Sequence, residues 1–281
     1  MPQGGLMHSE HPDIGDEDLA RIGMLLEMHC NFPVSVYKDK CVKRRIAIRM
    51  RSNRCSDAAA YCNLLRQSEQ ELDQLRKVLT IHVSQFFRNP SMFEKLSREV
   101  LPFIYRNCAE NGMPLRIWSL GCASGEEAYS LAILLREHFA RDLRRTSTTI
   151  DATDIDEETL QAARKAEFHM DRLKDLPDGL FERYFQPNGF RVQLKSVIRE
   201  MVSFYQGDIT VVTRFQPCNL VLCRNTLIYF TRSDQEKILH GVADILPVGG
   251  ILVLGKSETL VGEVRRRFTP VCPIERIYRR V

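Results

Sequence analysis

The chain has 281 residues, enough to bury one large hydrophobic core or two smaller ones. Its 40 basic and 36 acidic side chains give a formal net charge of +4, a surplus too small to indicate nucleic-acid or membrane binding by itself. No segment approaches the roughly 18 apolar residues of a membrane span, and the start of the chain lacks the apolar stretch of a signal peptide. The nine cysteines form no CxxC pair, so the composition predicts a cytoplasmic protein without a zinc site or a disulfide framework.

The first 81 residues have the pattern of a small helical domain. Residues 1–15 contain glycine, proline and histidine without periodicity, so we expect a flexible tail there. A first helix is expected from Asp16, because apolar residues then recur at helical spacing behind an acidic start. Residues 38–54 hold eight Lys or Arg and one acid, yet one face is apolar, which predicts a basic amphipathic helix. Residues 57–80 predict a further helix with Asp57 as its cap.

After Pro114 the pattern changes to short apolar runs separated by helix-like segments. The runs favour β-strands and cover residues 115–121, 148–156, 219–223 and 251–255. Such alternation predicts a parallel sheet flanked by helices. Residues 177–205 interrupt it with an Asn-Gly turn between short strand-like pieces, which predicts a small β subdomain.

The first of these runs turns into a helix through Gly121 and Gly125, followed by Glu126 and Glu127. Ligands of open α/β sheets bind at such turns. The GxxxG spacing does not match the dinucleotide fingerprint, and no lysine follows as in a P-loop. Two glutamates would repel a pyrophosphate but suit a ligand with an ammonium or sulfonium cation, and S-adenosylmethionine carries both. On this segment alone, the alternative that the glutamates only complement the helix dipole stays open.

Carboxylates that suit an adenosyl group follow two other predicted strands. Asp154 ends the run 148–156, where an acid can accept hydrogen bonds from both ribose hydroxyls. Asp156 directly precedes a helical run and fits a helix cap better. Asp208 follows a further β-like stretch, where its carboxylate suits the adenine amino group, although a turn explains it equally well.

Several motifs occur together in one order: TIHVSQFFRNPSMFEKL, SLGCASGEEAYSLAILL, ATDID, CRNTLIYF and LGKSETL. With them, residues 35–281 resemble the CheR family of chemotaxis-receptor protein-glutamate O-methyltransferases. The resemblance implies an α/β fold, namely a class I S-adenosylmethionine-dependent methyltransferase (Rossmann-like) domain with a small inserted β subdomain, preceded by a small all-helical N-terminal domain. We therefore expect a tail over 1–15, a helical domain over 16–81, and a methyltransferase domain over 82–281 with its β subdomain at about 177–205.

The resemblance also implies a set of site residues. Those expected to bind the cofactor are His82, Ser84, Arg88, Gly121, Glu127, Asp154, Asp208, Ile209, Arg224 and Asn225. Arg88 and Tyr229 are expected to face the reacting methyl group as catalytic residues. Three cofactor positions and Lys256 depart from the family pattern, since His82 stands where Asn is frequent, Ser84 where Thr is common, Asp208 where Asn is common, and Lys256 in place of the usual His. Phe86 and Phe87 are expected in the core, and Tyr129 is expected to support the glycine turn.

The function that the resemblance implies is methyl transfer from S-adenosylmethionine to glutamates of chemotaxis receptors, leaving S-adenosylhomocysteine. Basic residues of the helical domain are expected to dock the cytoplasmic helical region of a receptor: Lys43, Arg44, Arg45, Arg49, Arg51 and Arg54. A solvated basic face is the alternative. Residues 186–201 lack room for a longer glycine loop that grips a receptor's C-terminal pentapeptide, so we expect no such tether.

We expect a monomer that binds no metal and no nucleic acid and does not insert into a membrane. Two other functions stay open: a nucleic-acid methyltransferase, and a non-catalytic S-adenosylmethionine sensor.

Overall fold

The computed structural model describes residues 14–30, 32–80, 84–212 and 216–281, and the chain divides into two units. The helical unit runs to Ile81 and also contains Tyr229–Thr231. The sheet unit contains His82–Ile228 and Arg232–Val281. The three residues at 229–231 were not expected to leave the larger domain. No helix in the described ranges is long and apolar enough to cross a membrane.

The described residues of the helical unit form four α-helices, two of which begin at a side-chain cap. They are α1 (Asp16–Cys30), α2 (Asp39–Ser52), α3 (Ala58–Gln67) and α4 (Glu69–Leu79), with a 3-10 turn at Val34–Val36. The expected cap at Asp57 is confirmed, because its carboxylate accepts the N–H of Ala60 at 2.8 Å. The single helix expected over 57–80 is wrong: Ser68 is extended, with φ −131°, and its side chain accepts the N–H of Glu71, so a new helix begins there.

The core of the helical unit is built from the apolar faces of these helices. Fully buried members include Ile22, Leu26, Ile46, Met50, Leu65 and Leu75. Ile14 belongs to the same core and is only 3% exposed, so the packed structure begins within the segment expected to be a flexible tail. Residues 1–13 of that expected tail lie outside the described residues.

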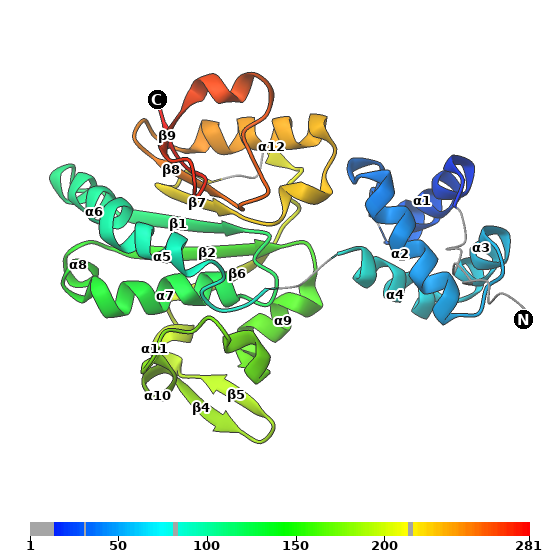
Figure 1. The fold of residues 1–281 in the computed structure, drawn as a ribbon, viewed down its shortest axis with the longest axis horizontal. Coiled ribbons are helices and arrows are strands. Elements are labelled where there is room, and N and C mark those ends of the chain that lie inside the picture. Colours follow the sequence, from blue (N-terminus) through cyan, green and yellow to red (C-terminus); the bar gives the residue numbers. More distant parts are fainter. Residues whose placement is uncertain (1–13, 31, 81–83, 213–215) are drawn as a thin grey trace, which may run out of the picture. The chain divides into compact units, whose positions relative to one another are not determined.

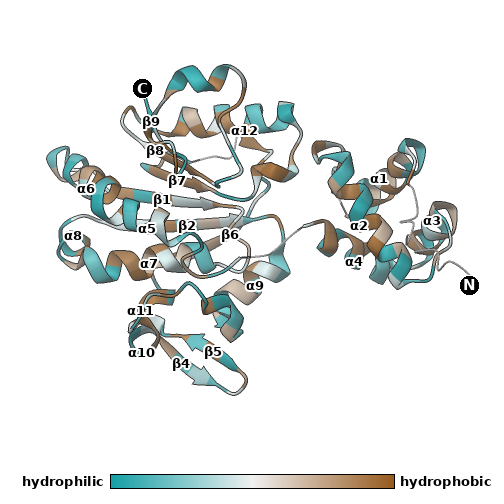
Figure 2. Ribbon diagram, viewed as in Figure 1, coloured by the Kyte–Doolittle hydropathy of each residue, from teal (hydrophilic) through white to brown (hydrophobic). Residues whose placement is uncertain are grey.

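The sheet unit is built on a seven-stranded sheet in the order β6-β2-β1-β7-β8-β10-β9. The strands are β1 (Leu115–Leu120), β2 (Thr148–Asp154), β6 (Val202–Gln206), β7 (Leu220–Cys223), β8 (Ile251–Leu254), β9 (Phe268–Cys272) and β10 (Ile277–Arg280). The first five are parallel, and β10 runs antiparallel to both of its neighbours. The four strands expected from sequence are confirmed as β1, β2, β7 and β8, whose apolar residues are buried; β7 and β8 are brown along their length in Figure 2.

Helices cover both faces of this sheet (Figure 1), with α7 (Glu126–His138) and α9 (Glu157–Lys165) on one face and α12 (Arg232–Ile245) on the other. The other helical segments are α5 (Pro90–Lys95), a π-helical turn (Leu96–Val100), α6 (Leu101–Glu110), α8 (Ala140–Arg145), α10 (Leu180–Tyr184), α11 (Ser196–Arg199), and 3-10 turns at Met170–Leu173, Leu227–Tyr229 and Gly262–Arg267. Between β6 and β7, the described residues 207–212 and 216–219 contain no α-helix.

The small β subdomain is a three-stranded sheet in the order β3-β5-β4. Its strands are β3 (Glu167–Phe168), β4 (Phe185–Asn188) and β5 (Arg191–Leu194). The expected range of 177–205 is therefore wrong at both ends, since the sheet begins ten residues earlier with β3, and residues 202–205 belong to β6 of the large sheet. Residues 189–190 form a two-residue hairpin turn, one residue later than the expected Asn-Gly turn, because Asn188 pairs with Arg191 in the strands.

Candidate functional site

The glycine turn after β1 is held open by two left-handed glycines. Gly121 has φ 69°, and a Cβ there would lie 2.5 Å from Oγ1 of Thr226. Gly125 has φ 88° and precedes α7, and a Cβ there would lie 2.8 Å from Cζ of Phe204. The carbonyl of Thr153 accepts the N–H groups of Gly121 and Cys122, each at 2.9 Å. The turn is thereby fixed to the end of β2.

The two glutamates after this turn point to different partners. Glu127 accepts the hydroxyl of Ser119 at 2.8 Å on Oε1 and a guanidinium N–H of Arg224 at 2.9 Å on Oε2. Glu126 is 1% exposed, and its Oε1 lies 3.8 Å from a guanidinium nitrogen of Arg172. Both lie in the first turn of α7, where acidic side chains complement the helix dipole. Glu127 additionally connects α7 to β1 and to the loop after β7.

The carboxylates at the end of β2 also divide their roles. Asp156 is confirmed as the cap of α9, because its Oδ1 accepts the N–H of Glu158 at 3.0 Å and of Thr159 at 3.4 Å. Asp154 is 7% exposed and accepts the N–H of Ala123 at 2.9 Å and of Asp156 at 3.1 Å. Asp154 thus lies against the glycine turn, where a ribose is expected.

We call residues 84–89 the Arg88 turn. The carbonyl of Ser84 accepts a guanidinium N–H of Arg172, and the N–H of Phe87 donates to Oγ of Ser130 at 2.9 Å. Phe87 and Asn89 have φ values of 52° and 66°, a left-handed conformation that non-glycine residues rarely adopt. The surrounding contacts therefore hold a backbone that would not adopt this shape alone.

Arg224, directly after β7, connects this turn to α7. Its guanidinium donates to the carbonyl of Arg88 at 2.8 Å, to Oδ1 of Asn89 at 2.7 Å and to Glu127. Its side chain is 3% exposed. Arg224 was expected to line the cofactor site; the structure shows its side chain engaged by protein groups around that site.

The two phenylalanines of the Arg88 turn pack in the core, as expected, with exposures of 0% for Phe86 and 4% for Phe87. Tyr129 is also buried, and its hydroxyl donates to the carbonyl of Ala163 at 2.9 Å. Its ring comes within 3.2 Å of the Cβ position at Gly125, which agrees with a supporting role for the glycine turn.

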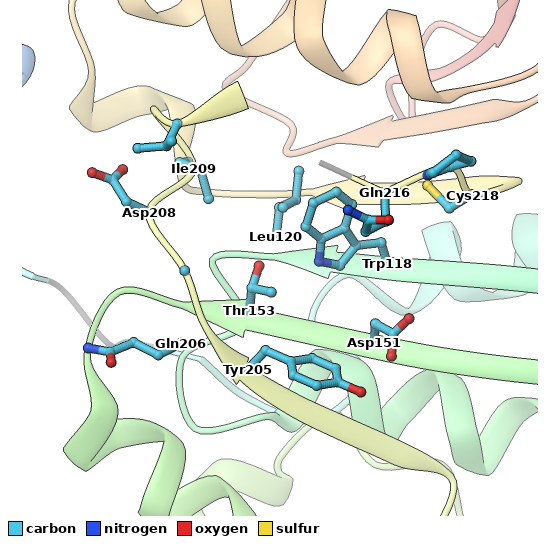
Figure 3. A pocket seen from close by; sticks show the side chains of 13 residues that line it. Trp118, Leu120, Asp151, Thr153, Tyr205, Gln206, Asp208, Ile209, Gln216 and Cys218 are labelled. Atoms are coloured by element: carbon cyan, nitrogen blue, oxygen red, sulfur yellow. The ribbon is translucent and has the colours of Figure 1, made fainter. Parts of the chain in front are cut away.

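Asp208 and Ile209 follow β6 and line one end of a pocket of about 320 Å³ (Figure 3). Oδ1 of Asp208 accepts both the N–H of Thr210 at 2.8 Å and its hydroxyl at 2.7 Å. The turn expected as an alternative is therefore present. Both contacts use one carboxylate oxygen, so the other is left for a ligand amino group.

The rest of this pocket was missed by the sequence analysis. From β1, β2 and β6 it is lined by Trp118, Leu120, Asp151, Thr153 and Tyr205, which Figure 3 shows on one face of the strands. Their alternation with buried residues of the opposite face was the signal available in the sequence. Burial raises the pKa of Asp151. The volume falls at the lower end of the range for small-molecule sites.

For two of the expected residues, the place at this site stays a prediction. His82 lies outside the described residues. Tyr229 belongs to the helical unit, where its ring lies under the guanidinium of Arg45, 5.3 Å from the ring centre, and its carbonyl accepts the N–H of Lys38 at 2.8 Å. Of the two expected catalytic residues, Arg88 belongs to the sheet unit and Tyr229 to the helical unit.

The six expected docking residues divide into two sets. Lys43 pairs with Asp16 at 2.6 Å, Arg45 donates to the carbonyl of Leu79, and Arg49 pairs with Glu71. These three are partly buried and contribute to the fold. The other three are exposed: Arg44, Arg51 and Arg54.

A family model described as "CheR methyltransferase, SAM binding domain" matches residues 82–274, and "CheR methyltransferase, all-alpha domain" matches residues 17–80. The chain belongs to the CheR methyltransferase family. It is a methyltransferase that uses S-adenosylmethionine, with the class I α/β fold and the helical N-terminal domain expected from sequence.

Relatives with this architecture include a chemotaxis protein methyltransferase 2 of Vibrio cholerae, 34% identical and covering 78% of this chain and 77% of its own. The chemotaxis protein methyltransferase of Escherichia coli is 28% identical over 94% of this chain and 91% of its own. The "Uncharacterized 104.1 kDa protein in hypE 3'region" of Rhodobacter capsulatus is 35% identical over 93% of this chain, which spans 27% of that protein. Among solved structures, the glycopeptide N-methyltransferase MtfA is 16% identical over 54% of this chain and 55% of its own, with a TM-score of 0.32.

The residues present fit S-adenosylmethionine. The glycine turn offers a close backbone approach, and the carboxylates of Glu127 and Asp154 border it with the charge that a cationic ligand and a ribose require. The pocket beyond Asp208 offers an apolar floor for a flat base, built largely from Leu120 and Ile209.

Proposed function

We propose that this CheR-family protein transfers the methyl group of S-adenosylmethionine to glutamate side chains of chemotaxis receptors, forming methyl esters. The observation that carries the proposal is the Arg88 turn, a strained segment held by Arg224 and Ser130 beside the glycine turn and its acidic neighbours. A guanidinium there suits a carboxylate substrate, because arginine can donate two parallel hydrogen bonds to its oxygens. The relatives named for chemotaxis support the receptor as the source of that carboxylate.

The chemistry asks for positioning and little acid–base help. A glutamate has a reference pKa near 4.3 and is already a carboxylate nucleophile at neutral pH. Bound S-adenosylmethionine supplies an electrophilic methyl group on a sulfonium. The site must hold the carboxylate oxygen roughly 3–3.5 Å from the methyl carbon and in line with the sulfur. Arg88 must orient the carboxylate without binding it more tightly in the ground state than in the transition state, since excess ground-state binding would slow transfer.

The test is transfer of radiolabelled methyl from S-adenosylmethionine to a receptor cytoplasmic fragment, followed by mild base and capture of volatile methanol. We expect base-labile label, which marks a carboxyl methyl ester. The matched control is the same fragment with its acceptor glutamates changed to glutamine, which should take up no label. Label that survives base would indicate nitrogen or nucleic-acid methylation. No label despite measurable cofactor binding would indicate a sensor and contradict the proposal.

We further propose that receptor recognition does not depend on a C-terminal pentapeptide. The β4–β5 hairpin has only Gly189 and Phe190 in its turn, which leaves no long loop to grip a peptide. Pro187 lies in β4, the edge strand, opposite Val192. In a two-residue hairpin the pair next to the turn is hydrogen-bonded, so the Pro187 pair is not, and the nitrogen of Pro187 faces the open edge. Proline has no N–H, and an added strand would lose a hydrogen bond there.

Receptor fragments with and without their last five residues test this second proposal. We expect equal kcat/KM for the two fragments. Tighter calorimetric binding of the fragment that keeps its tail would contradict it.

A further inference from the structure

Glu258 lies just after β8, in the motif LGKSE, and is none of the residues expected to bind the cofactor. It is 4% exposed. A buried carboxylate is costly unless hydrogen bonds replace the water it has lost. The hydrogen-bond partners of Glu258 therefore indicate which part of the structure its carboxylate stabilises.

Four backbone N–H groups donate to this one carboxylate. Oε2 accepts from Asn225 at 2.9 Å and from Gly255 at 2.6 Å. Oε1 accepts from Thr226 at 2.9 Å and from Ile228 at 3.3 Å. Three of the four donors belong to the loop after β7, and the fourth belongs to the loop after β8, so the carboxylate ties the ends of two neighbouring strands together.

In the part of the chain that the structure describes, backbone N–H groups are the partners that compensate this charge. Among the described residues, no basic side chain lies within ion-pair distance of Glu258. Burial raises the pKa of Glu258, and the four N–H groups act in the opposite direction. The loop therefore stabilises the charged form of the carboxylate, and the carboxylate stabilises the conformation of the loop.

The loop that Glu258 holds is part of the cofactor site. Asn225 has φ 58°, a left-handed conformation that needs support from its surroundings. Its neighbour Arg224 holds the carbonyl of Arg88 and the carboxylate of Glu127. A shift of the backbone at 225 would move Arg224 and, through it, the Arg88 turn.

We propose that Glu258 is a positioning residue for methyl transfer: its carboxylate fixes residues 225–228 in the conformation that cofactor binding requires. The inference rests on the S-adenosylmethionine-dependent activity of the CheR family and not on the choice of receptor. Glu258 touches neither substrate and acts through the backbone that it holds.

Glu275 provides a matched control within the same unit. Its exposure is 8%, its Oε1 lies 3.8 Å from the ammonium of Lys256, and its Oε2 has no hydrogen-bond partner among the described residues. It is a buried carboxylate, and no hydrogen bond or ion pair among the described residues joins its side chain to the loop after β7 or to the Arg88 turn. A loss of stability alone should therefore follow Glu275→Gln.

The experiment compares Glu258→Gln and Glu275→Gln in the full chain. Thermal unfolding shows the temperature at which each variant is folded, and calorimetry then measures the Kd of S-adenosylhomocysteine. For Glu258→Gln we expect the Kd to rise about tenfold or more, because an amide places N–H donors against backbone N–H groups and leaves some unpaired. The KM for S-adenosylmethionine should rise in parallel, and the KM for the receptor fragment should stay within about twofold.

For Glu275→Gln we expect a Kd within about twofold of the wild type. A folded Glu258→Gln protein with unchanged Kd and KM values would overturn the inference, as would an equal loss in Glu275→Gln. If Glu258→Gln does not fold, Glu258→Asp serves, since it keeps the charge but is too short to reach both loops, and the same rise in Kd is expected. A wild type that binds S-adenosylhomocysteine without labelling receptors would contradict only the receptor proposal.

Discussion

The helical unit and the sheet unit each contain a largely buried arginine–glutamate pair whose glutamate also accepts a hydrogen bond from a hydroxyl. In the helical unit, Arg49 of α2 pairs with Glu71 of α4, and the side chains are 19% and 7% exposed. In the sheet unit, Arg224 pairs with Glu127 at exposures of 3% and 13%. The hydroxyl of Tyr61 donates to Glu71 at 2.7 Å. The two clusters contain the same chemical groups.

They differ in what they connect. The Arg49–Glu71 pair joins regular helices whose positions the apolar core already fixes. The Arg224–Glu127 pair joins the loop after β7 to α7, and the same guanidinium holds the carbonyl of Arg88 in a turn whose backbone is left-handed at Phe87 and Asn89. The same interaction therefore contributes stability in one place and active-site geometry in the other. Four predictions test this difference.

The largest effect is expected for Arg224→Met. The variant leaves Glu127 buried without its cation and releases the carbonyl of Arg88. Breaking a buried pair costs roughly 3–5 kcal/mol of stability. Because the Arg88 turn also loses its hydrogen bonds from this guanidinium, kcat/KM for methyl transfer should fall by about 100-fold or more. Initial rates measure kcat/KM, and calorimetry with S-adenosylhomocysteine measures the cofactor affinity. Unchanged cofactor affinity together with a lower Tm would show that the Arg224–Glu127 pair contributes only to stability, like the Arg49–Glu71 pair.

Arg49→Met should lower the free energy of unfolding of the helical unit by roughly 3–5 kcal/mol. The Kd of S-adenosylhomocysteine should not change. Trp118 is the one tryptophan of the chain and lies in the sheet unit, so its fluorescence reports that unit alone. We expect the circular dichroism transition to move to lower urea ahead of the Trp118 transition. A shift of both transitions together would contradict independent roles.

Low pH should destabilise the helical unit, because Glu71 becomes protonated. Burial alone would raise its pKa, but hydrogen bonds from Arg49, Tyr61 and Asn53, with the charge of Arg49, lower it below its ordinary value of 4.5. A lowered folded pKa gives stability that is present above about pH 4.5 and is lost as the pH falls through the folded pKa. Unfolding free energies from pH 7 to pH 3 should show this loss in the wild type. Glu71→Gln should show a flatter profile at lower stability.

The smallest effect is expected for the exposed arginines of α2. Arg44→Gln with Arg51→Gln should raise the KM for a receptor fragment about fivefold at low salt, because rim charges contribute modestly and are screened. Cofactor affinity and unfolding should stay at wild-type values. Arg21→Gln, an exposed arginine of α1, is the control and should change none of these. An equal KM change in the control would mean that α2 is not the docking surface.

Regular elements could be predicted because their signals are local. The helices of the first unit and four strands of the sheet follow from periodicity within short windows. The break at Ser68 was also signalled, since Ser68 and Glu71 have the spacing of a capping box. The strands β9 and β10 were not predicted, and in β10 the basic pair Arg279 and Arg280 follows only two apolar residues. In the structure Ile277 is fully buried, and Arg279 lies 4.5 Å from the ring centre of Phe103.

The site could be predicted as a set of residue types but not as a set of partners. Glycine and acid at strand ends indicated the ligand, and Asp154 and Glu127 lie beside the glycine turn. Which groups hold each other depends on contacts between distant segments, such as Arg224 with Arg88, and a single sequence carries no local signal for them. The role of Glu258 was not predicted for the same reason, because its four donors come from two loops that only the sheet brings together.

The position of β10 has a consequence for synthesis on the ribosome. In sequence it follows β9, yet in the sheet it lies between β8 and β9 and pairs with both. A nascent chain that has reached only Cys272 has a gap inside its sheet, and β9 has no neighbour to join. Completion of this sheet must therefore wait until residues 277–280 have left the exit tunnel, and until then two strand edges are open to mispairing or to chaperones.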